Sequence, residues 1–219
     1  MIQFILVMEY HCRLVCPQNL IISGASQQGK TYLTCQSILR HKDLFLEPLS
    51  AVYLFHRHYQ PLYEMLKNQL DIPLYIYSEP PEPDFRPIPN SLVVFDDYIE
   101  LDNEVIRSFF IRKSHHYRCS CWYLLQNIFS KNKTMRDITL NAQQIVLFNP
   151  KRDQGQLDRL NYQLLGGKNA GFLPTLFKRM EDRKHAYLLI DLAEECPRQF
   201  RFRSTLVPGN DTLVFQPQK

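Results

Sequence analysis

Short runs of apolar residues recur along the 219-residue chain, with polar segments between them. The runs that have the length of a strand are residues 19–23, 51–55, 73–77, 92–95, 119–125, 144–148 and 186–192. Most of them are continuously apolar, which is typical of strands that are covered on both faces. Apolar residues at helical spacing lie between several of the runs, at residues 30–40, 59–70, 153–165 and 172–183. The alternation predicts an α/β fold in which helices flank a mostly parallel central sheet.

The two ends of the chain carry further strand patterns. Residues 1–8 are apolar, but the run is short and has no basic segment before it, so we expect a buried strand rather than a signal peptide or membrane span. Residues 200–207 alternate between apolar and polar, and 212–215 form another apolar run. With Pro-Gly-Asn-Asp at 208–211 as the turn, they predict a C-terminal β-hairpin. We expect one domain over residues 1–219, with a core at about 17–192 and a C-terminal β extension at about 193–219.

The most specific signal follows the apolar residues 20–23. The next eight residues fit the pattern G-x-x-x-x-G-K-[ST] and are Gly24, Ala25, Ser26, Gln27, Gln28, Gly29, Lys30 and Thr31. In this pattern backbone N–H groups surround phosphate oxygens, the lysine reaches the terminal phosphates, and the hydroxyl binds the accompanying Mg²⁺. A tight glycine turn would explain Gly24 but gives no reason for Lys30 and Thr31. Because a predicted strand precedes the segment and a predicted helix follows it, we expect a nucleotide-binding phosphate loop.

Polar residues at the ends of two later runs could complete such a site. Asp96 and Asp97 follow the apolar residues 92–95, and Gln126 follows 122–125. Nucleotide hydrolysis needs a carboxylate near the Mg²⁺ and a group that orients the attacking water, and we assign these roles to Asp96 and Asp97. Ligands of open α/β sheets bind beyond the carboxyl ends of the strands, where Gln126 could sense the γ-phosphate or the water. Each feature alone also fits a simple turn after a buried strand.

The composition narrows the class of protein only slightly. Charged residues make up 22% and hydrophobic residues 45% of the chain, and the net charge of +4 permits an acidic partner without requiring one. The six cysteines show no repeated C-x-x-C spacing, which favours buried free thiols in a reducing compartment over zinc ligands. His11, Cys12 and Cys16 could form part of a metal site, but buried thiols are the simpler interpretation.

Residues 105–136 carry many positive charges and no negative charge. They contain seven lysines and arginines and no acidic residue: Arg107, Arg112, Lys113, Arg118, Lys131, Lys133 and Arg136. Such a stretch favours a polyanion through counterion release, although a solvated face is the commoner explanation of a charge run. An arginine from it could also reach the phosphates of a neighbouring subunit. His115 and His116 lie inside the stretch and are too few to predict a metal site.

Several segments form an ordered set along the chain. They are residues 111–116, 123–129, 135–142 and 145–153, then Tyr-Leu-Leu-Ile-Asp-Leu at 187–192 and Phe-Arg-Phe-Arg at 200–203. Together with the phosphate loop and the acidic pair, this set resembles the DNA-packaging ATPases of adintoviruses and Maverick/Polinton elements. These enzymes are similar to the packaging ATPases of poxviruses and virophages and belong to the FtsK/HerA superfamily. The resemblance covers nearly the whole chain, about residues 19–207.

The resemblance implies a RecA-like (ASCE) P-loop ATPase that works as a homo-oligomeric ring. Such a motor uses Mg²⁺ and ATP to drive double-stranded DNA into a preformed capsid. The resemblance therefore implies DNA and a capsid protein as partners, and it implies no association with a membrane. It also implies a location inside the infected cell, in the nucleus or a cytoplasmic virus factory, or in association with the virion.

Residue by residue, the resemblance implies that Lys30 and Thr31 bind the phosphates and Mg²⁺. Asp96 and Asp97 match the Walker B pair, with Asp96 beside the Mg²⁺. Gln126 matches the sensor glutamine. Arg136 is the first choice for an arginine finger that acts on the nucleotide of the neighbouring subunit, and Arg112 and Arg118 are the alternatives.

The chain departs from the family pattern at two places. Gln27 and Gln28 stand where relatives usually have small residues or glycine, which predicts less backbone freedom and weaker nucleotide binding. Asp97 stands where the superfamily often has glutamate, so its shorter side chain requires a closer approach to the water. Neither departure predicts loss of activity. Two other functions stay open from the sequence: a P-loop nucleoside or small-molecule kinase, and a nucleotide-binding switch without catalysis.

Overall fold

Ten strands form one sheet in the computed structural model, which describes residues 2–7, 13–98, 104–128, 133–150, 154–207 and 212–217. The strands are β1 (Ile2–Val7), β2 (Asn19–Ser23), β3 (Val52–His56), β4 (Leu74–Tyr77), β5 (Leu92–Asp96), β6 (Ser120–Leu125), β7 (Gln144–Phe148), β8 (Tyr187–Asp191), β9 (Phe202–Arg203) and β10 (Thr212–Pro217). The strands from β2 to β8 lie within one or two residues of the predicted runs, because apolar segments of this length between turn residues leave little choice of element.

Helices connect most of the strands. They are α1 (Lys30–Leu39), α2 (His41–Leu44), α3 (Leu62–Gln69), α4 (Glu104–Ser108), α5 (Ser114–His116), α6 (Lys133–Leu140), α7 (Gln154–Leu165) and α8 (Phe172–Arg179). A π-helical turn, η1 (Phe109–Lys113), joins α4 to α5, and two short 3-10 turns occur at Gly167–Asn169 and Arg198–Phe200. Pro174 lies in the first turn of α8, and the helix ends at Arg179 although the sequence pattern predicts a helix as far as residue 183. None of the described helices is long and apolar enough to cross a membrane.

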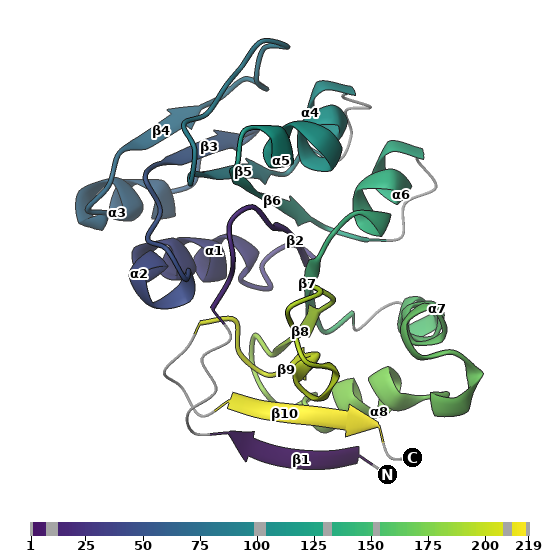
Figure 1. The fold of residues 1–219 in the computed structure, drawn as a ribbon. Coiled ribbons are helices and arrows are strands. Elements are labelled where there is room, and N and C mark those ends of the chain that lie inside the picture. The colour runs from purple at the N-terminus through teal and green to yellow at the C-terminus, as the bar shows by residue number, and fades with distance from the viewer. Residues whose placement is uncertain are drawn as a thin grey trace.

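The strand order is β1-β10-β9-β8-β7-β2-β6-β5-β3-β4 (Figure 1). The six strands from β7 to β4 are parallel to one another, which confirms the mostly parallel sheet. β6 lies between β2 and β5, pairing with both, although it follows them in the sequence. The carboxyl ends of β2, β6 and β5 therefore meet at one edge of the sheet, with the end of β6 in the middle.

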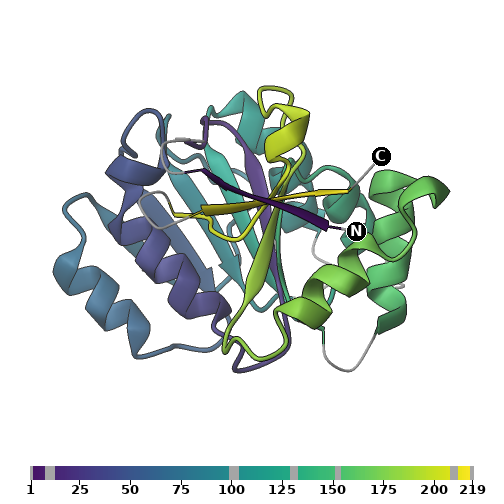
Figure 2. The ribbon, with the colours of Figure 1, turned by 90° about the horizontal axis from the view of Figure 1, so that it is seen from below.

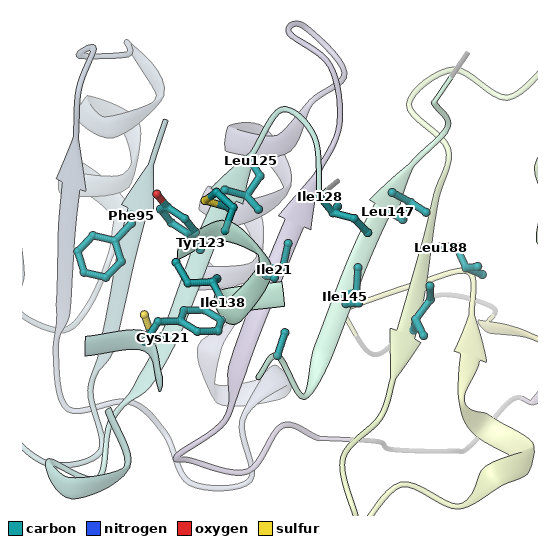
Figure 3. Close-up of a cluster of buried hydrophobic side chains, with 14 of the residues drawn as sticks. Ile21, Phe95, Cys121, Tyr123, Leu125, Ile128, Ile138, Ile145, Leu147 and Leu188 are labelled. Atoms are coloured by element: carbon teal, nitrogen blue, oxygen red, sulfur yellow. The ribbon is translucent and has the colours of Figure 1, made fainter. Parts of the chain in front are cut away.

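Helices cover both faces of the parallel strands, as the continuously apolar runs predict. Alternate residues of β2 belong to different clusters: Ile21 packs with residues of α4, α6, α7 and α8, whereas Leu20 and Ile22 pack with residues of α1, α2 and α3. Figure 2 shows α1 and α3 (blue) on one side of the sheet and α7 and α8 (green) on the other. Figure 3 shows the first cluster, where side chains of β2, β5, β6, β7 and β8 point to the same face.

The remaining strands extend the sheet in antiparallel order from β8 to β1. β9 and β10 pair as the predicted C-terminal hairpin, and its turn at 208–211 lies outside the described residues. The N-terminal strand is confirmed as β1, and it pairs with β10 at the end of the strand order, so it is an edge strand of the sheet.

A buried ion pair joins β9 of the hairpin to β8. The guanidinium of Arg203 on β9 lies 2.6 Å from Asp191 on β8, and the two side chains are 4% and 6% exposed. The alternating pattern of residues 200–207 suggests an arginine on an outer face, but Arg203 is buried. Its charge is compensated by Asp191, and the carbonyl of Phe200 accepts a further hydrogen bond.

Candidate functional site

The segment Gly24–Thr31 joins the carboxyl end of β2 to the first turn of α1, as the motif requires. Gly24 is needed because a Cβ on it would lie 2.7 Å from the Cβ of Phe148 on β7. Gly29, at the N-cap of α1, has a left-handed φ of 100° that glycine adopts freely. Gln27 also has a left-handed φ, of 65°, and there a side chain is strained. The loop therefore requires glycine at position 24 for space and favours it at position 29 for its backbone conformation, whereas Gln27 adopts a strained conformation.

The side chain of Gln28 folds back over this loop. Its Oε1 accepts a hydrogen bond of 2.8 Å from the N–H of Ala25, and its Nε2 donates one of 2.8 Å to the carbonyl of Asn149 after β7. The N–H of Ala25 belongs to the set that the motif offers to phosphate oxygens. Gln28 thus occupies a donor that the nucleotide would use.

Replacement of Gln28 by alanine is expected to tighten ATP binding by about fivefold, because it frees the N–H of Ala25 from a hydrogen bond worth about 1 kcal/mol. Calorimetric titration with ATP measures the change. Gln69→Ala, at an exposed position on α3, is the matched control and should bind like the wild type. Unchanged or weaker binding by Gln28→Ala would show that this glutamine does not oppose the nucleotide.

Lys30 and Thr31 connect the phosphate loop to the acidic pair. The Nζ of Lys30 donates to the carbonyls of Gly24 and Ala25 at 2.7 and 3.2 Å, so its charge lies inside the curve of the loop. Burial lowers the pKa of Lys30, and the charges of Asp96 and Asp97 oppose that shift. The hydroxyl of Thr31 donates to Oδ2 of Asp96 at 3.0 Å. The structure thus brings the loop lysine and threonine together with the carboxylate that ends β5.

Asp96 is buried and accepts hydrogen bonds from several directions. The hydroxyl of Tyr63 on α3 donates to its Oδ2 at 2.6 Å, and Nε2 of Gln60 lies 3.4 Å from the same atom and 3.1 Å from the hydroxyl of Thr31. Sequence reasoning missed both residues. Tyr63 was assigned only to the apolar stripe of the helix, and Gln60 stands in no motif, so only packing of α3 against α1 brings them to the site.

His56 is another buried neighbour of Asp96. It lies on β3, directly opposite Asp96 in the register between β3 and β5. Burial lowers the pKa of His56, and the charge of Asp96 raises it in part. Its Nδ1 is buried and has no hydrogen-bond partner among the described residues. With this lowered pKa the His56 ring is neutral at pH 7, so it does not compensate the negative charge of Asp96.

Burial raises the pKa of Asp96, and hydrogen bonds from Tyr63 and Thr31 with the charge of Lys30 reverse this only in part. The unfolded chain ionises this carboxyl at about pH 4 and the folded chain only at a higher pH, so the destabilisation is absent well below about pH 4, grows between the two pKa values and is constant above the pKa of the folded state. Asp96→Asn is therefore expected to have a higher Tm than the wild type at pH 7, with a difference that shrinks towards low pH. Thermal unfolding of both proteins without nucleotide, across this pH range, measures it. An equal difference at every pH would contradict the assignment.

Oxygen atoms of Thr31 and Asp96 would suit Mg²⁺, which prefers oxygen ligands and usually takes only one or two carboxylates alongside substrate phosphates. The 3.0 Å between the hydroxyl and the carboxylate allows both to face one small cation or its water shell. Among the described residues no group of three or more His, Cys, Asp or Glu is placed to hold a metal by itself. The donor set thus fits a cation that arrives with a nucleotide.

Asp97 and Gln126 lie together at the same edge of the sheet. Asp97 follows β5 with a left-handed φ of 64°, a conformation that Asp tolerates better than most residues. The Nε2 of Gln126, after β6, donates to its Oδ1 at 3.3 Å. Because β6 lies between β2 and β5, Gln126 stands between the phosphate loop and Asp97, as a residue that senses the γ-phosphate would have to.

The three candidate arginine fingers are exposed. Arg136 lies on α6, which packs against α4 and η1 on the face opposite to α1, and Arg112 and Arg118 lie on η1 and just before β6. Among the described residues, no hydrogen bond or ion pair joins these three arginines to the phosphate loop of their own chain. Arg107 is different, because it forms ion pairs with Glu104 and Asp137, so the basic stretch is partly compensated by acidic residues at its two ends.

The cysteines behave largely as buried thiols. Cys35, Cys119 and Cys121 are buried and free, while Cys16 and Cys196 are partly exposed. Burial raises the pKa of Cys35 and of Cys119 to about 12, so neither thiol ionises at neutral pH. His11 and Cys12, the other members of the weak metal pattern, lie outside the described residues.

The fold is similar to that of a viral protein whose structure has been solved. The genome packaging NTPase B204 from Sulfolobus turreted icosahedral virus 2, in complex with AMPPCP, matches with a TM-score of 0.50 and 14% identity over 80% of this chain and 93% of that chain. The same protein in complex with ATP-gammaS matches with a TM-score of 0.46 and 13% identity over 80% and 92% of the two chains. No protein-family model and no curated protein sequence matches the chain. The first likeness shows a shared α/β fold with a mostly parallel sheet and C-terminal antiparallel strands.

Proposed function

We propose that the protein is an ATP-dependent genome-packaging motor, which hydrolyses Mg-ATP to move double-stranded DNA into a capsid. One observation carries the proposal. At a single edge of the sheet, Thr31 of the phosphate loop is hydrogen-bonded to Asp96, and Asp97 beside it is hydrogen-bonded to Gln126. This combination supports attack of water on a nucleotide more than transfer to an acceptor, because Asp97 and Gln126 are suited to orient water.

Each residue has a role in this proposal. Lys30 moves away from the loop carbonyls and neutralises charge on the terminal phosphates. Thr31 and Asp96 would supply oxygen atoms to the Mg²⁺ or to its water shell. Asp97 polarises the attacking water, and Gln126 orients that water and contacts the γ-phosphate. Arg136 of the neighbouring subunit stabilises the charge that develops in the transition state.

The fold shared with a genome packaging NTPase supports packaging over other uses of a phosphate loop. We further propose that the chain acts as a homo-oligomeric ring, because among the described residues none of Arg112, Arg118 and Arg136 is hydrogen-bonded or ion-paired to the phosphate loop of its own chain. Double-stranded DNA and a capsid protein are the proposed partners. The lineage among adintoviruses and Maverick/Polinton elements, the location in the infected cell and the single-domain organisation over residues 1–219 remain predictions from the sequence.

Steady-state ATP hydrolysis tests the proposal. The wild type is measured with and without linear double-stranded DNA across a series of protein concentrations, and Lys30→Ala controls for contaminating activity. We expect turnover that depends on Lys30 and rises with both DNA and protein concentration. Turnover indifferent to both would point to a kinase or an unrelated NTPase, which a panel of phosphate acceptors would identify. Nucleotide binding without turnover on any DNA would instead favour a switch.

A further inference from the structure

The apolar stripe of α3 contains one polar group that packing does not require. Tyr63 is fully buried, and its ring lies against the rings of His56 and Tyr59, with centroids 5.3 and 5.6 Å apart. A phenylalanine would fill nearly the same space and keep these ring contacts. The hydroxyl is therefore the part of Tyr63 that needs an explanation, and its hydrogen-bond partner is Asp96.

The hydrogen bonds to Asp96 all converge on one of its two carboxylate oxygens. Oδ2 accepts from the hydroxyl of Tyr63 at 2.6 Å and from that of Thr31 at 3.0 Å, and Nε2 of Gln60 lies 3.4 Å from it. No described residue donates to Oδ1. A carboxylate that is held through Oδ2 cannot rotate freely, so Oδ1 keeps one direction and is the oxygen left for a cation or its water.

Only Tyr63 is both close to Asp96 and independent of the ligand. Thr31 is itself assigned to Mg²⁺, and Nε2 of Gln60 is shared between Asp96 and the hydroxyl of Thr31, which lies 3.1 Å from it. The hydrogen bond from Tyr63 is short and goes to a carboxylate, which places it among the stronger ones in proteins. Because α3 packs against α1 with Tyr63 buried, the direction of this hydroxyl is fixed before a nucleotide arrives.

We propose that Tyr63 is a positioning residue, whose hydroxyl holds Oδ2 of Asp96 so that Oδ1 is presented to the Mg²⁺ of the nucleotide or to the water shell of that ion. Hydrogen-bond partners of this kind orient the carboxylates that bind metals, and their loss typically lowers metal affinity about 10-fold to 100-fold. The inference rests on the proposed function, because it assumes that Mg-ATP binds to the loop Gly24–Thr31.

Tyr63→Phe tests the inference, because it removes the hydroxyl and keeps the ring that the core requires. The affinity for the non-hydrolysable analogue AMPPCP is measured by calorimetric titration, once with excess Mg²⁺ and once with EDTA. We expect the variant to bind about tenfold more weakly than the wild type in Mg²⁺ and equally well in EDTA. A purely structural role of the hydroxyl would instead change both affinities by the same factor.

Tyr53→Phe is the matched control. Tyr53 is also a buried tyrosine, but it belongs to the cluster on the other face of the sheet, and its hydroxyl accepts a hydrogen bond of 3.4 Å from the N–H of Ile88. The same atom is removed there without a contact to Asp96. Binding of AMPPCP by this variant should depend on Mg²⁺ as it does in the wild type.

A double-mutant cycle with Asp96→Ala shows whether Tyr63 acts through the carboxylate. In the Asp96→Ala protein there is no carboxylate to hold, so adding Tyr63→Phe should not change the dependence of AMPPCP binding on Mg²⁺ any further. An effect of Tyr63→Phe that persists at full size without the carboxylate would overturn the inference.

The other outcomes separate the inference from the proposed function. Equal weakening in Mg²⁺ and EDTA, or an unchanged affinity in Mg²⁺, would also overturn the role of Tyr63, while the ATPase stands as long as hydrolysis depends on Lys30. Absence of hydrolysis that depends on Lys30 would overturn the proposed function instead. The titrations need neither turnover nor DNA, so they decide the role of Tyr63 in either case.

Discussion

Asp97→Asn is expected to lose about 100-fold to 10,000-fold in kcat for ATP hydrolysis while binding ATP with nearly wild-type affinity. The amide cannot take a proton from water or polarise it as a carboxylate does. Asn also tolerates the left-handed φ of 64° at this position, so the substitution should not disturb the backbone. Steady-state hydrolysis gives kcat, and calorimetric titration with ATP gives the affinity.

Asp158→Asn provides the matched control for this result. Asp158 is exposed on α7, and the same chemical change there should leave hydrolysis unaltered. A variant Asp97→Asn that retains full kcat would exclude Asp97 as the group that activates water. The hydrogen bond from Gln126 to Asp97 would then have to be explained by packing of the two strand ends.

Arg136→Ala is expected to reduce hydrolysis about 1,000-fold or more under conditions that favour the ring, with ATP binding retained. The reason is that a finger acts only on the transition state of the neighbouring subunit and adds little to binding of the ground state. Arg136 is exposed on α6, so its truncation should not change the core. Hydrolysis and ATP titration are measured at the same protein concentration as the wild type.

Mixing two inactive variants tests whether the arginine acts between subunits. Arg136→Ala subunits retain a complete phosphate loop, and Lys30→Ala subunits retain the finger. A mixed ring therefore contains some complete sites, and we expect part of the activity to return on mixing. If Arg136→Ala alone hydrolyses ATP normally in rings, the assignment is wrong. Arg112→Ala and Arg118→Ala, measured in the same way, would then identify the finger.

The sequence by itself determined most of the parallel sheet. Runs such as 20–22 and 145–148 are apolar throughout, which is typical of strands that are covered on both faces. The phosphate loop could also be located from sequence, because its function depends on a local order of glycines, lysine and threonine. The pairing of Asp96 with Thr31 followed from the same motif logic and is seen as a hydrogen bond of 3.0 Å.

Only the tertiary structure decided which residues surround that motif. Tyr63 reaches Asp96 because α3 packs against α1, and an apolar stripe in the sequence does not say which of its members carries a polar group to the site. Likewise, Arg203 was part of an alternating pattern that suggests exposure, but it is buried against Asp191. Partners that lie on separate elements depend on packing, which periodicity along one element does not contain.

The direction of β8 is the clearest case. The apolar run 186–192 predicts a strand but carries no information on its direction, since a run reads the same in either orientation. Because β8 is antiparallel to β7, its beginning rather than its end lies at the edge with the phosphate loop, where Phe148 pairs with Tyr187. That orientation alone places His185 against Gln28 of the phosphate loop. The phosphate loop can thus be predicted from a short segment of sequence. The residues that surround it depend on pairing between strands that are far apart in the chain.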